Sequence, residues 1–295
     1  MKILRNISFL TLLALFATVI YASAQDAPKK EILIIDRFTQ PGNIQSNYTQ
    51  GVRNSVINSF TERGRFIVVD AAKDTRLQKL SQERTGEDAV NENNVLEESR
   101  SAAIKSTGAK YLVSGSVVTY GNKRTTKDGQ TTYTSVLTFS LDGYIITTGE
   151  VVASKQYEVT GLGKTRTEAD NNAIEAVKMK TTFFINENFT FTTSILQLEA
   201  AKKGKLKELY IHCGSGIGVQ RGDIFMVYME KDIAGINTLQ EIGRLRAIEI
   251  AGEEVCKCTV TAGNKEISDA FNSQKKLVVR SAGVGGLNGL LMNLQ

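Results

Sequence analysis

The sequence contains no tryptophan and only one histidine, His212. A hydrolase site of the serine or cysteine type needs a base beside the nucleophile, and that base is usually histidine. His212 lies in an apolar run with the pattern of a strand, so we expect it to be structural or merely exposed. Aromatic residues are few, which together with the missing tryptophan counts against carbohydrate binding. The sequence therefore predicts no catalytic residue.

Long apolar runs are missing beyond the N-terminus, so no later segment is suited to a transmembrane helix. At the N-terminus, a short positively charged region precedes an uncharged apolar stretch over residues 7–20. Ala22-Ser23-Ala24 then supplies the small residues that a signal peptidase needs. This pattern predicts a signal peptide over residues 1–24 with cleavage before Gln25, and an uncleaved membrane anchor is the alternative. We expect the mature protein to be periplasmic or associated with the outer membrane.

Cysteine is also scarce, with three residues in the chain. The first of them is Cys213, so we expect no lipid anchor at the N-terminus. Cys256 and Cys258 are one residue apart, which is too close for the paired ligands of a zinc site. Both should point to one face of a strand and pack in the core as small apolar residues. A disulfide from Cys213 to either one stays open, because export favours oxidation. We predict no metal site and no cofactor.

The formal net charge is +5, and acidic residues are interspersed with the basic ones. Nucleic-acid binding favours a clustered basic face and a recognisable motif. The sequence has neither feature, so we expect no nucleic-acid partner.

Residues 25–190 predict an α/β domain, because helical patterns come early and consecutive strands come later. The expected order is β-α-β-α-α-β-β-β-α, which indicates a mixed sheet with helices packed on it. The expected strands cover 31–36, 65–70, 110–120, 131–144 and 150–160, and the expected helices cover 48–62, about 70–82, 95–107 and 165–180. Residues 121–130 are rich in glycine, lysine and threonine and are expected to form a hairpin loop.

Residues 205–282 predict a small all-β domain of the barrel or SH3-like type, because short strand patterns alternate with glycine-rich turns. The expected strands cover 207–212, 223–230, 241–251, 254–261 and 276–280, with a single helical turn at 268–272. Residues 283–295 are an apolar, glycine-rich tail, which is expected to dock on a partner's sheet edge, to pack back on its own barrel, or to be a frayed end.

Three glycine-containing motifs are better explained by turns than by ligand binding. Gly163-Lys164-Thr165 lacks the earlier glycine of a phosphate-binding loop, since Glu158 stands there, and Thr165 or Thr167 is expected to cap the following helix. Gly214, Gly216 and Gly218 lead into a strand rather than a helix, which excludes the dinucleotide pattern. Arg221-Gly222-Asp223 matches an adhesion tripeptide, but its glycine is where a hairpin needs one.

Four stretches in the first domain resemble the curli production assembly and transport family of envelope proteins. They are Ile34–Phe38, Gly64–Asp70, Gly108–Ser116 and Thr148–Val152. The resemblance covers roughly residues 31–185 and extends to α/β domains of lipoprotein activators of penicillin-binding proteins. It implies the fold and the compartment. Two departures separate this chain from the family's channel members, namely the missing lipidation cysteine and the short, polar segment 121–130 in place of a membrane-spanning hairpin.

The second domain is similar to the C-terminal domain of a flagellar assembly protein. The residues that carry this resemblance are Gly218–Phe225, Ile242–Leu245 and Cys258–Val260.

The sequence leads us to expect a non-enzymatic, exported assembly or accessory protein of the cell envelope. It would act through protein–protein contacts with envelope partners, with self-association among the alternatives. The candidate interaction regions are 39–47, 85–94, 121–130 and the tail. One alternative is an outer-membrane secretion-channel subunit of the curli type, and another is an envelope hydrolase with an unrecognised site. The sequence assigns no catalytic, cofactor-binding or metal residue.

Overall fold

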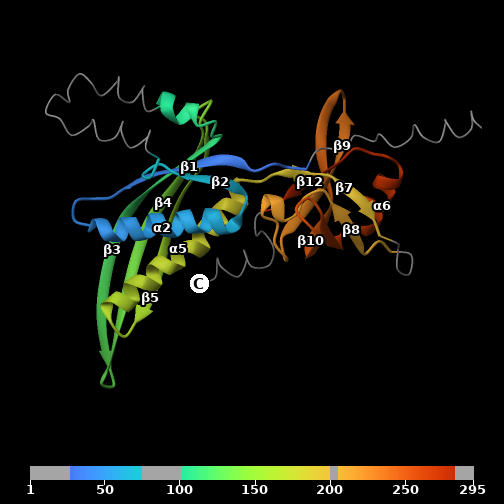
Figure 1. Cartoon of the computed structure of the whole chain (residues 1–295). Coiled ribbons are helices and arrows are strands. Elements are labelled where there is room, and N and C mark those ends of the chain that lie inside the picture. Colours follow the sequence, from blue (N-terminus) through green and yellow to red (C-terminus); the bar gives the residue numbers. More distant parts are fainter. Residues whose placement is uncertain (1–26, 75–100, 200–204, 283–295) are drawn as a thin grey trace, which may run out of the picture.

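The computed structural model describes residues 27–74, 101–199 and 205–282, which form two lobes (Figure 1). The predicted signal peptide, the polar region 85–94 and the tail 283–295 lie outside the described residues, as does most of the helix expected over 70–82. Each lobe is built around its own sheet.

The first lobe contains a mixed five-stranded sheet with the order β2-β1-β3-β4-β5. The strands are β1 (Glu31–Thr39), β2 (Phe66–Asp70), β3 (Tyr111–Lys127), β4 (Gln130–Ile145) and β5 (Val151–Gly163). β1 pairs in parallel with β2 and β3, whereas β3, β4 and β5 are antiparallel. Leu33, Ile34 and Ile35 are fully buried on both faces of β1, as expected of a central parallel strand. The predicted mixed α/β sheet is confirmed.

Two helices cover one face of this sheet side by side, α2 (Ser46–Arg63) and α5 (Arg166–Asn188) (Figure 1). The apolar stripe of α2, including Val52, Val56 and Phe60, is buried in the same core as Phe139 of β4. α5 begins where predicted, since the Thr165 side chain accepts a hydrogen bond from the Glu168 backbone N–H at 3.1 Å. It continues past residue 180, because Phe184 and Ile185 also belong to this core.

The loop predicted over residues 121–130 is wrong. β3 and β4 stay paired through Thr126–Thr131 to Lys127–Gln130, and only Asp128 and Gly129 form the turn. Asp128 and Gly129 have φ angles of 50° and 76°, which suit a tight hairpin turn. The segment is polar, but its threonines are β-branched and favour strands. Thr126 and Thr131 also join their hydroxyl groups across the two strands at 3.1 Å.

The second lobe is a nearly closed, seven-stranded barrel-like sheet with the order β6-β12-β9-β10-β11-β8-β7, which confirms the predicted all-β fold. The strands are β6 (Thr192–Thr193), β7 (Ile195–Leu198), β8 (Glu208–Ile211), β9 (Ile224–Ile233), β10 (Ile236–Ile250), β11 (Cys256–Ala262) and β12 (Leu277–Ser281). Its core contains Leu209, Phe225 and Val227. The helical turn expected at 268–272 is the end of a longer helix, α6 (Asn264–Asn272).

β6 and β7 were not predicted, because two- and four-residue strands carry too little pattern to recognise. They place residues 192–198 in the second sheet, ahead of the predicted start at 205. The domain bounds 25–190 and 205–282 otherwise stay predictions.

Candidate functional site

The last residue of α2, Arg63, links the two lobes. Its side chain is 5% exposed. Within the first lobe, its Nε donates a hydrogen bond to Asn186 Oδ1 of α5 at 2.9 Å. Across the junction, Nη1 donates to the Gly218 carbonyl oxygen at 2.5 Å and Nη2 donates to Asp223 Oδ2 at 2.8 Å. A single guanidinium therefore ties both helices of the first lobe to the second, since its planar fork can serve several acceptors at once.

Gly218 allows the two backbones to meet at this point. It ends a short 3-10 helix (Ser215–Ile217) with φ 70°, in the left-handed region that favours glycine. A Cβ atom on Gly218 would lie 2.1 Å from the Arg63 carbonyl oxygen and 2.6 Å from the Gly64 carbonyl carbon. No other residue type fits this position without moving the lobes apart.

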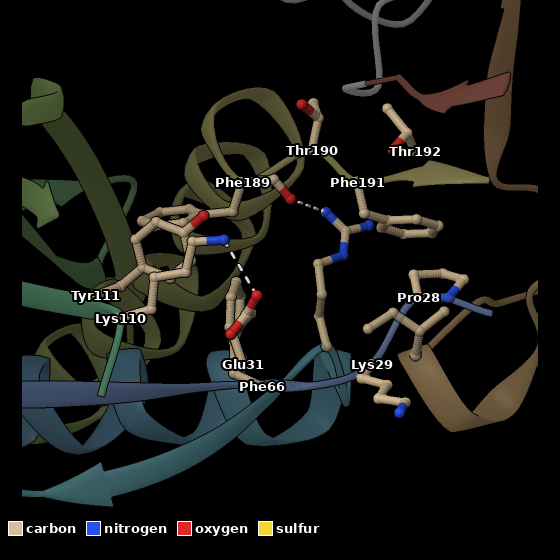
Figure 2. Close-up of a pocket in the computed structure, with 12 residues that line it drawn as sticks. Pro28, Lys29, Glu31, Phe66, Lys110, Tyr111, Phe189, Thr190, Phe191 and Thr192 are labelled. Atoms are coloured by element: carbon tan, nitrogen blue, oxygen red, sulfur yellow. Dashed lines mark hydrogen bonds and ion pairs between the residues drawn. The ribbon is translucent and has the colours of Figure 1, made fainter. Parts of the chain in front are cut away.

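A pocket of about 360 Å³ opens at the same junction (Figure 2). Its lining comes from the segment leading into β1, the start of β2, residues 110–111 and the segment that follows α5. Phe66, Tyr111 and Phe189 form aromatic walls, with ring centroids 5.2 Å apart for Tyr111–Phe189 and 5.4 Å apart for Phe66–Phe189. Lys110 donates to Glu31 Oε1 at 3.0 Å, and Figure 2 shows this ion pair at one side of the pocket.

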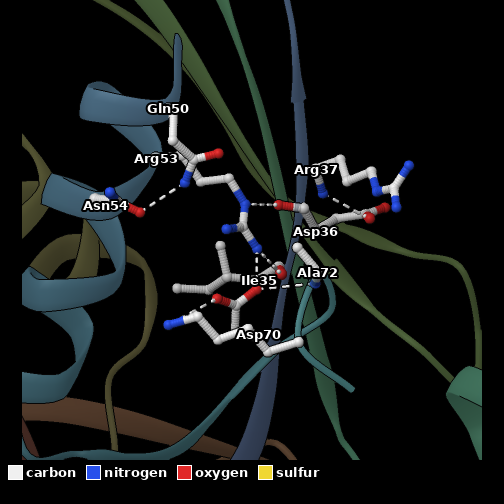
Figure 3. A network of polar contacts seen from close by, with 9 residues as sticks. Ile35, Asp36, Arg37, Gln50, Arg53, Asn54, Asp70 and Ala72 are labelled. Carbon is white, nitrogen blue, oxygen red and sulfur yellow. Dashed lines mark hydrogen bonds and ion pairs between the residues drawn. The ribbon is translucent and has the colours of Figure 1, made fainter. Parts of the chain in front are cut away.

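A second polar network joins α2 to the carboxyl ends of β1 and β2 (Figure 3). The buried Arg53 donates from Nε to the Asp36 carbonyl oxygen at 2.8 Å and forms an ion pair with Asp70. Burial alone would raise the pKa of Asp70, but the hydrogen bonds from Arg53 and from the Ala72 backbone N–H outweigh it and lower the pKa. Because the carboxylate is held by these donors, we assign the network a structural role.

A third cluster surrounds Asp170 of α5, whose side chain is 7% exposed. Asp170 accepts hydrogen bonds from Tyr48 at 2.9 Å, Tyr120 at 2.6 Å and Ser135 at 2.5 Å. Burial tends to raise the pKa of Asp170, but these three hydroxyl donors together lower it. The rings of Tyr48 and Tyr120 stack with centroids 4.3 Å apart. A carboxylate occupied by so many donors is poorly suited to act as a general base.

β9 and β10 extend beyond their neighbours as a two-stranded hairpin. β12 pairs with β9 only as far as Met229, and β11 pairs with β10 only from Arg244 onward. The hairpin therefore projects from the second lobe (orange in Figure 1).

The tip of the β9–β10 hairpin is apolar. Ile233 and Ile236 face each other across the turn and are 53% and 68% exposed. Ala234 and Gly235 make the turn, with φ angles of 55° and 84°. Leu239 is also exposed, and by strand alternation it lies on the opposite face from Ile236. Turn residues are usually polar or glycine, so isoleucine on both sides of this one is unusual.

The loop 39–47 and two of the glycine-containing motifs are part of the folded lobes. In the predicted interaction region 39–47, Ile44 is buried and its carbonyl oxygen accepts a hydrogen bond from Gln40 Nε2 at 2.8 Å, so this loop is held in place. Gly163 and Thr165 form the strand-to-helix connector. Arg221 and Gly222 form the turn before β9, where Gly222 has φ 98°.

The three cysteines are buried free thiols in the core of the second lobe, as predicted for Cys256 and Cys258. The Cys256 and Cys258 Sγ atoms lie 3.8 Å apart, and burial raises the pKa of the Cys213 thiol. His212 is partly buried, with Nε2 3.9 Å from Glu254 Oε2. Among the described residues, no cluster of three or more histidine, cysteine or acidic side chains is arranged to hold a metal ion. The same part of the chain contains no helix that is long and apolar enough to cross a membrane.

Sequence reasoning missed Arg63, Arg65 and the β9–β10 tip. The tip could have been found, because Ile233-Ala234-Gly235-Ile236 combines a two-residue turn with flanking apolar residues. The arginines could not, since their partners are distant in sequence.

No protein-family model and no curated protein sequence matches the chain. Several solved structures are similar to part of it. The PelC dodecamer from Paraburkholderia phytofirmans is 16% identical with a TM-score of 0.33, and the match covers 53% of this chain and 93% of that one. Lipoprotein GNA1162 from Neisseria meningitidis is 15% identical with a TM-score of 0.33, covering 54% and 96%.

The LpoB C-terminal domain from Salmonella enterica is 17% identical with a TM-score of 0.27, covering 50% of this chain and 93% of that domain. Each match thus spans about half of this chain. Likeness at this level identifies neither a family nor a function.

Proposed function

We propose that the protein is an exported, non-enzymatic accessory protein of the cell envelope that acts through protein–protein contacts. The observation that carries this proposal is the tip of the β9–β10 hairpin, where Ile233 and Ile236 form an exposed cross-strand pair. Contiguous exposed apolar side chains on a protein surface are candidates for partner binding. The hairpin also projects past its neighbouring strands, so a partner can reach the tip without displacing the rest of the lobe.

The tip favours a protein partner with an apolar groove. The four residues from Ile233 to Ile236 are uncharged, so the tip offers little to a charged surface. Buried apolar side chains at the centre of an interface supply most of its binding energy. Two isoleucines on one face of a narrow hairpin, with Leu239 exposed on the other face, match a groove better than a flat surface.

The junction between the lobes supports a scaffolding role. Arg63 and Gly218 fix the second lobe against α2 through a buried, charge-assisted contact. A partner bound at the hairpin is therefore held in a set orientation relative to the first lobe. Within the described residues, the most organised polar clusters, around Asp70 and Asp170, are saturated by their own donors rather than poised for catalysis.

We also propose that the first lobe is related to the curli production assembly and transport family. The stretches that resemble this family lie within strands of the first sheet or lead into them. Ile34–Phe38 lies in β1, Gly64–Asp70 leads into and forms β2, Gly108–Ser116 leads into β3, and Thr148–Val152 leads into β5. The secretory pattern over residues 1–24 supports export, with cleavage before Gln25.

Site-specific photocross-linking in living cells tests the contact. A photoreactive amino acid at Ile236 should give a defined cross-linked product that is lost when Ile233 is changed to serine. The matched control carries the same amino acid at Asp128, the tip of the polar β3–β4 hairpin, where we expect no product. If Ile236 gives no defined product, or gives the same products as Asp128, the hairpin is not the contact site.

Cell fractionation with native sizing and N-terminal mass spectrometry of the untagged protein tests the compartment. We expect a periplasmic monomer or small oligomer that begins at Gln25. A large ring extracted from the outer membrane only by detergent would support the secretion-channel alternative instead. Turnover of cell-wall fragments by the purified protein would support the hydrolase alternative.

A further inference from the structure

Arg65, which immediately precedes β2, is buried without an acidic partner. Its side chain is 4% exposed, yet it forms no ion pair with any described residue. Nη1 donates to the Phe189 carbonyl oxygen at 2.8 Å, and the guanidinium carbon lies 5.2 Å from the centre of the Phe191 ring. The buried Nε has no hydrogen-bond partner in the described part of the chain. Such a charge is costly unless an anion compensates it.

Nearby groups of the protein do not supply this compensation. The closest acidic influence is Asp223, but its carboxylate already accepts from Arg63 Nη2 at 2.8 Å and from the Gln220 backbone N–H at 2.9 Å. Burial and the positive charge of Arg63 both lower the pKa of Arg65. The surroundings therefore disfavour the positive charge of the Arg65 guanidinium. The position therefore has more positive charge than the described residues can balance.

Arg65 lines the pocket at the domain junction, together with two lysines and one carboxylate. Lys110 and Glu31 neutralise each other at 3.0 Å. Lys29 is exposed and forms no ion pair among the described residues, and it also lines the pocket. The pocket thus contains a buried guanidinium, and the exposed Lys29 belongs to its lining.

Aromatic residues contribute to the rest of the lining, beside proline, threonine and isoleucine. Phe66, Tyr111, Phe189 and Phe191 all line the pocket, and Figure 2 shows Tyr111 and Phe189 together on one side and Phe191 on the other. A volume of about 360 Å³ suits a small molecule. The arginine fork can hold two oxygens of one carboxylate or phosphate, while the rings pack against an apolar body.

We propose that this pocket binds a small organic anion, with its carboxylate or phosphate group on Arg65 and its apolar ring or short chain against Phe66, Tyr111 and Phe191. Lys29, which belongs to the same lining, attracts the anion. The site is built from both lobes, so the bound molecule bridges them.

Thermal unfolding and calorimetric titration of the mature protein test the site. The probes are phenylacetate and phenyl phosphate, which share a ring but differ in the charged group, and 2-phenylethanol, which has the ring without charge. We expect at least one of the two anions to bind and to raise the unfolding temperature, since a ligand that binds only the folded state stabilises it. 2-Phenylethanol, acetate and inorganic phosphate should bind about tenfold more weakly or not at all.

Two variants separate the site from general effects. Arg65→Met keeps an apolar stem of similar length and removes the charge, so it should abolish binding. Lys29→Gln changes an exposed residue that has no ion pair among the described residues, and it should weaken binding several-fold and reduce its dependence on salt. Lys275→Gln, an exposed lysine outside this pocket, is the matched control and should bind like the unaltered protein.

Either of two results would overturn the proposal. One is that neither anion binds the unaltered protein. The other is that Arg65→Met binds an anion as tightly as the unaltered protein does.

Discussion

Arg63 and Asp223 are 160 residues apart in the sequence, yet Arg63 Nη2 donates to Asp223 Oδ2 at 2.8 Å across the domain junction. The arginine is buried and the aspartate is mostly buried, so the pair is shielded from solvent. A shielded pair adds little net stability compared with apolar residues in its place. Removing only one member is strongly destabilising, because the other charge is then left buried alone. The junction should therefore depend on both groups together.

Arg63→Ala should destabilise the protein by about 3–5 kcal/mol, since it leaves Asp223 without its cationic partner and the Gly218 carbonyl without its side-chain donor. The loss should also uncouple the lobes, so that calorimetry resolves two unfolding transitions where the unaltered protein shows fewer. Arg246→Ala, at an exposed position of β10, is the control and should change the free energy of unfolding little. A single unchanged transition in Arg63→Ala would contradict the role assigned to this side chain.

Gly218→Ala should be more damaging than Gly108→Ala, although both glycines have φ 70°. At Gly108 nothing lies within 4 Å of an added Cβ, so only backbone strain of about 1–2 kcal/mol is expected. At Gly218 the added atom also meets the backbone of Arg63 and Gly64, which should bring the cost to about 3 kcal/mol or more. Urea unfolding of the two variants measures the difference. Equal losses of the free energy of unfolding would show that the close approach of Gly218 to the Arg63 and Gly64 backbone does not contribute to stability.

Acid should weaken the protein partly through Asp170, because the pKa of this carboxyl is lower in the folded state than its ordinary value of 3.8. A lowered pKa contributes stability that is present above the ordinary value and is lost as the pH falls below it, through the folded-state value. Asp170→Asn should therefore flatten the dependence of the urea midpoint on pH between about pH 5 and about pH 2. Glu158→Gln, at an exposed position of β5, should leave that dependence intact. An unchanged slope in Asp170→Asn would argue against the cluster.

Ala234→Asn should stabilise the protein by about 0.5–1 kcal/mol, because asparagine tolerates positive φ better than alanine does. The β3–β4 hairpin provides the converse, since Asp128-Gly129 already has the residues that this type of turn prefers. Asp128→Ala should therefore cost a similar amount. Urea unfolding of both variants measures whether Ala234→Asn raises the free energy of unfolding and Asp128→Ala lowers it. A loss of stability in Ala234→Asn would show that the apolar tip tolerates no polar residue.

The two central regions of the fold were predictable for local reasons. β1 is a continuous apolar run, and α2 has an apolar stripe that ends at Gly64, so both follow from sequence pattern alone. Residues 121–130 were mistaken for a loop because their polarity hid the β-branched threonines that pair across β3 and β4. In general, a strand on a two-stranded extension has no buried face and therefore leaves no alternating apolar signal.

The junction and its pocket depended on three-dimensional contacts. Arg63 and Arg65 flank a glycine at the end of a helix, where basic residues are common for electrostatic reasons. Their partners in the second lobe, Gly218 and Phe191, follow by more than a hundred residues. Only the folded chain shows that these two arginines are buried and that one of them has no acidic partner.

The fixed junction also sets the separation of the two hairpin tips, one on each lobe, at Asp128-Gly129 and at Ala234-Gly235 (Figure 1). A partner that binds the β9–β10 tip and also touches the first lobe forms its second contact at a high effective concentration only when its two sites match the geometry that the junction sets. Substitutions at Arg63 would therefore change how well such a two-site partner fits, without altering the β9–β10 tip itself.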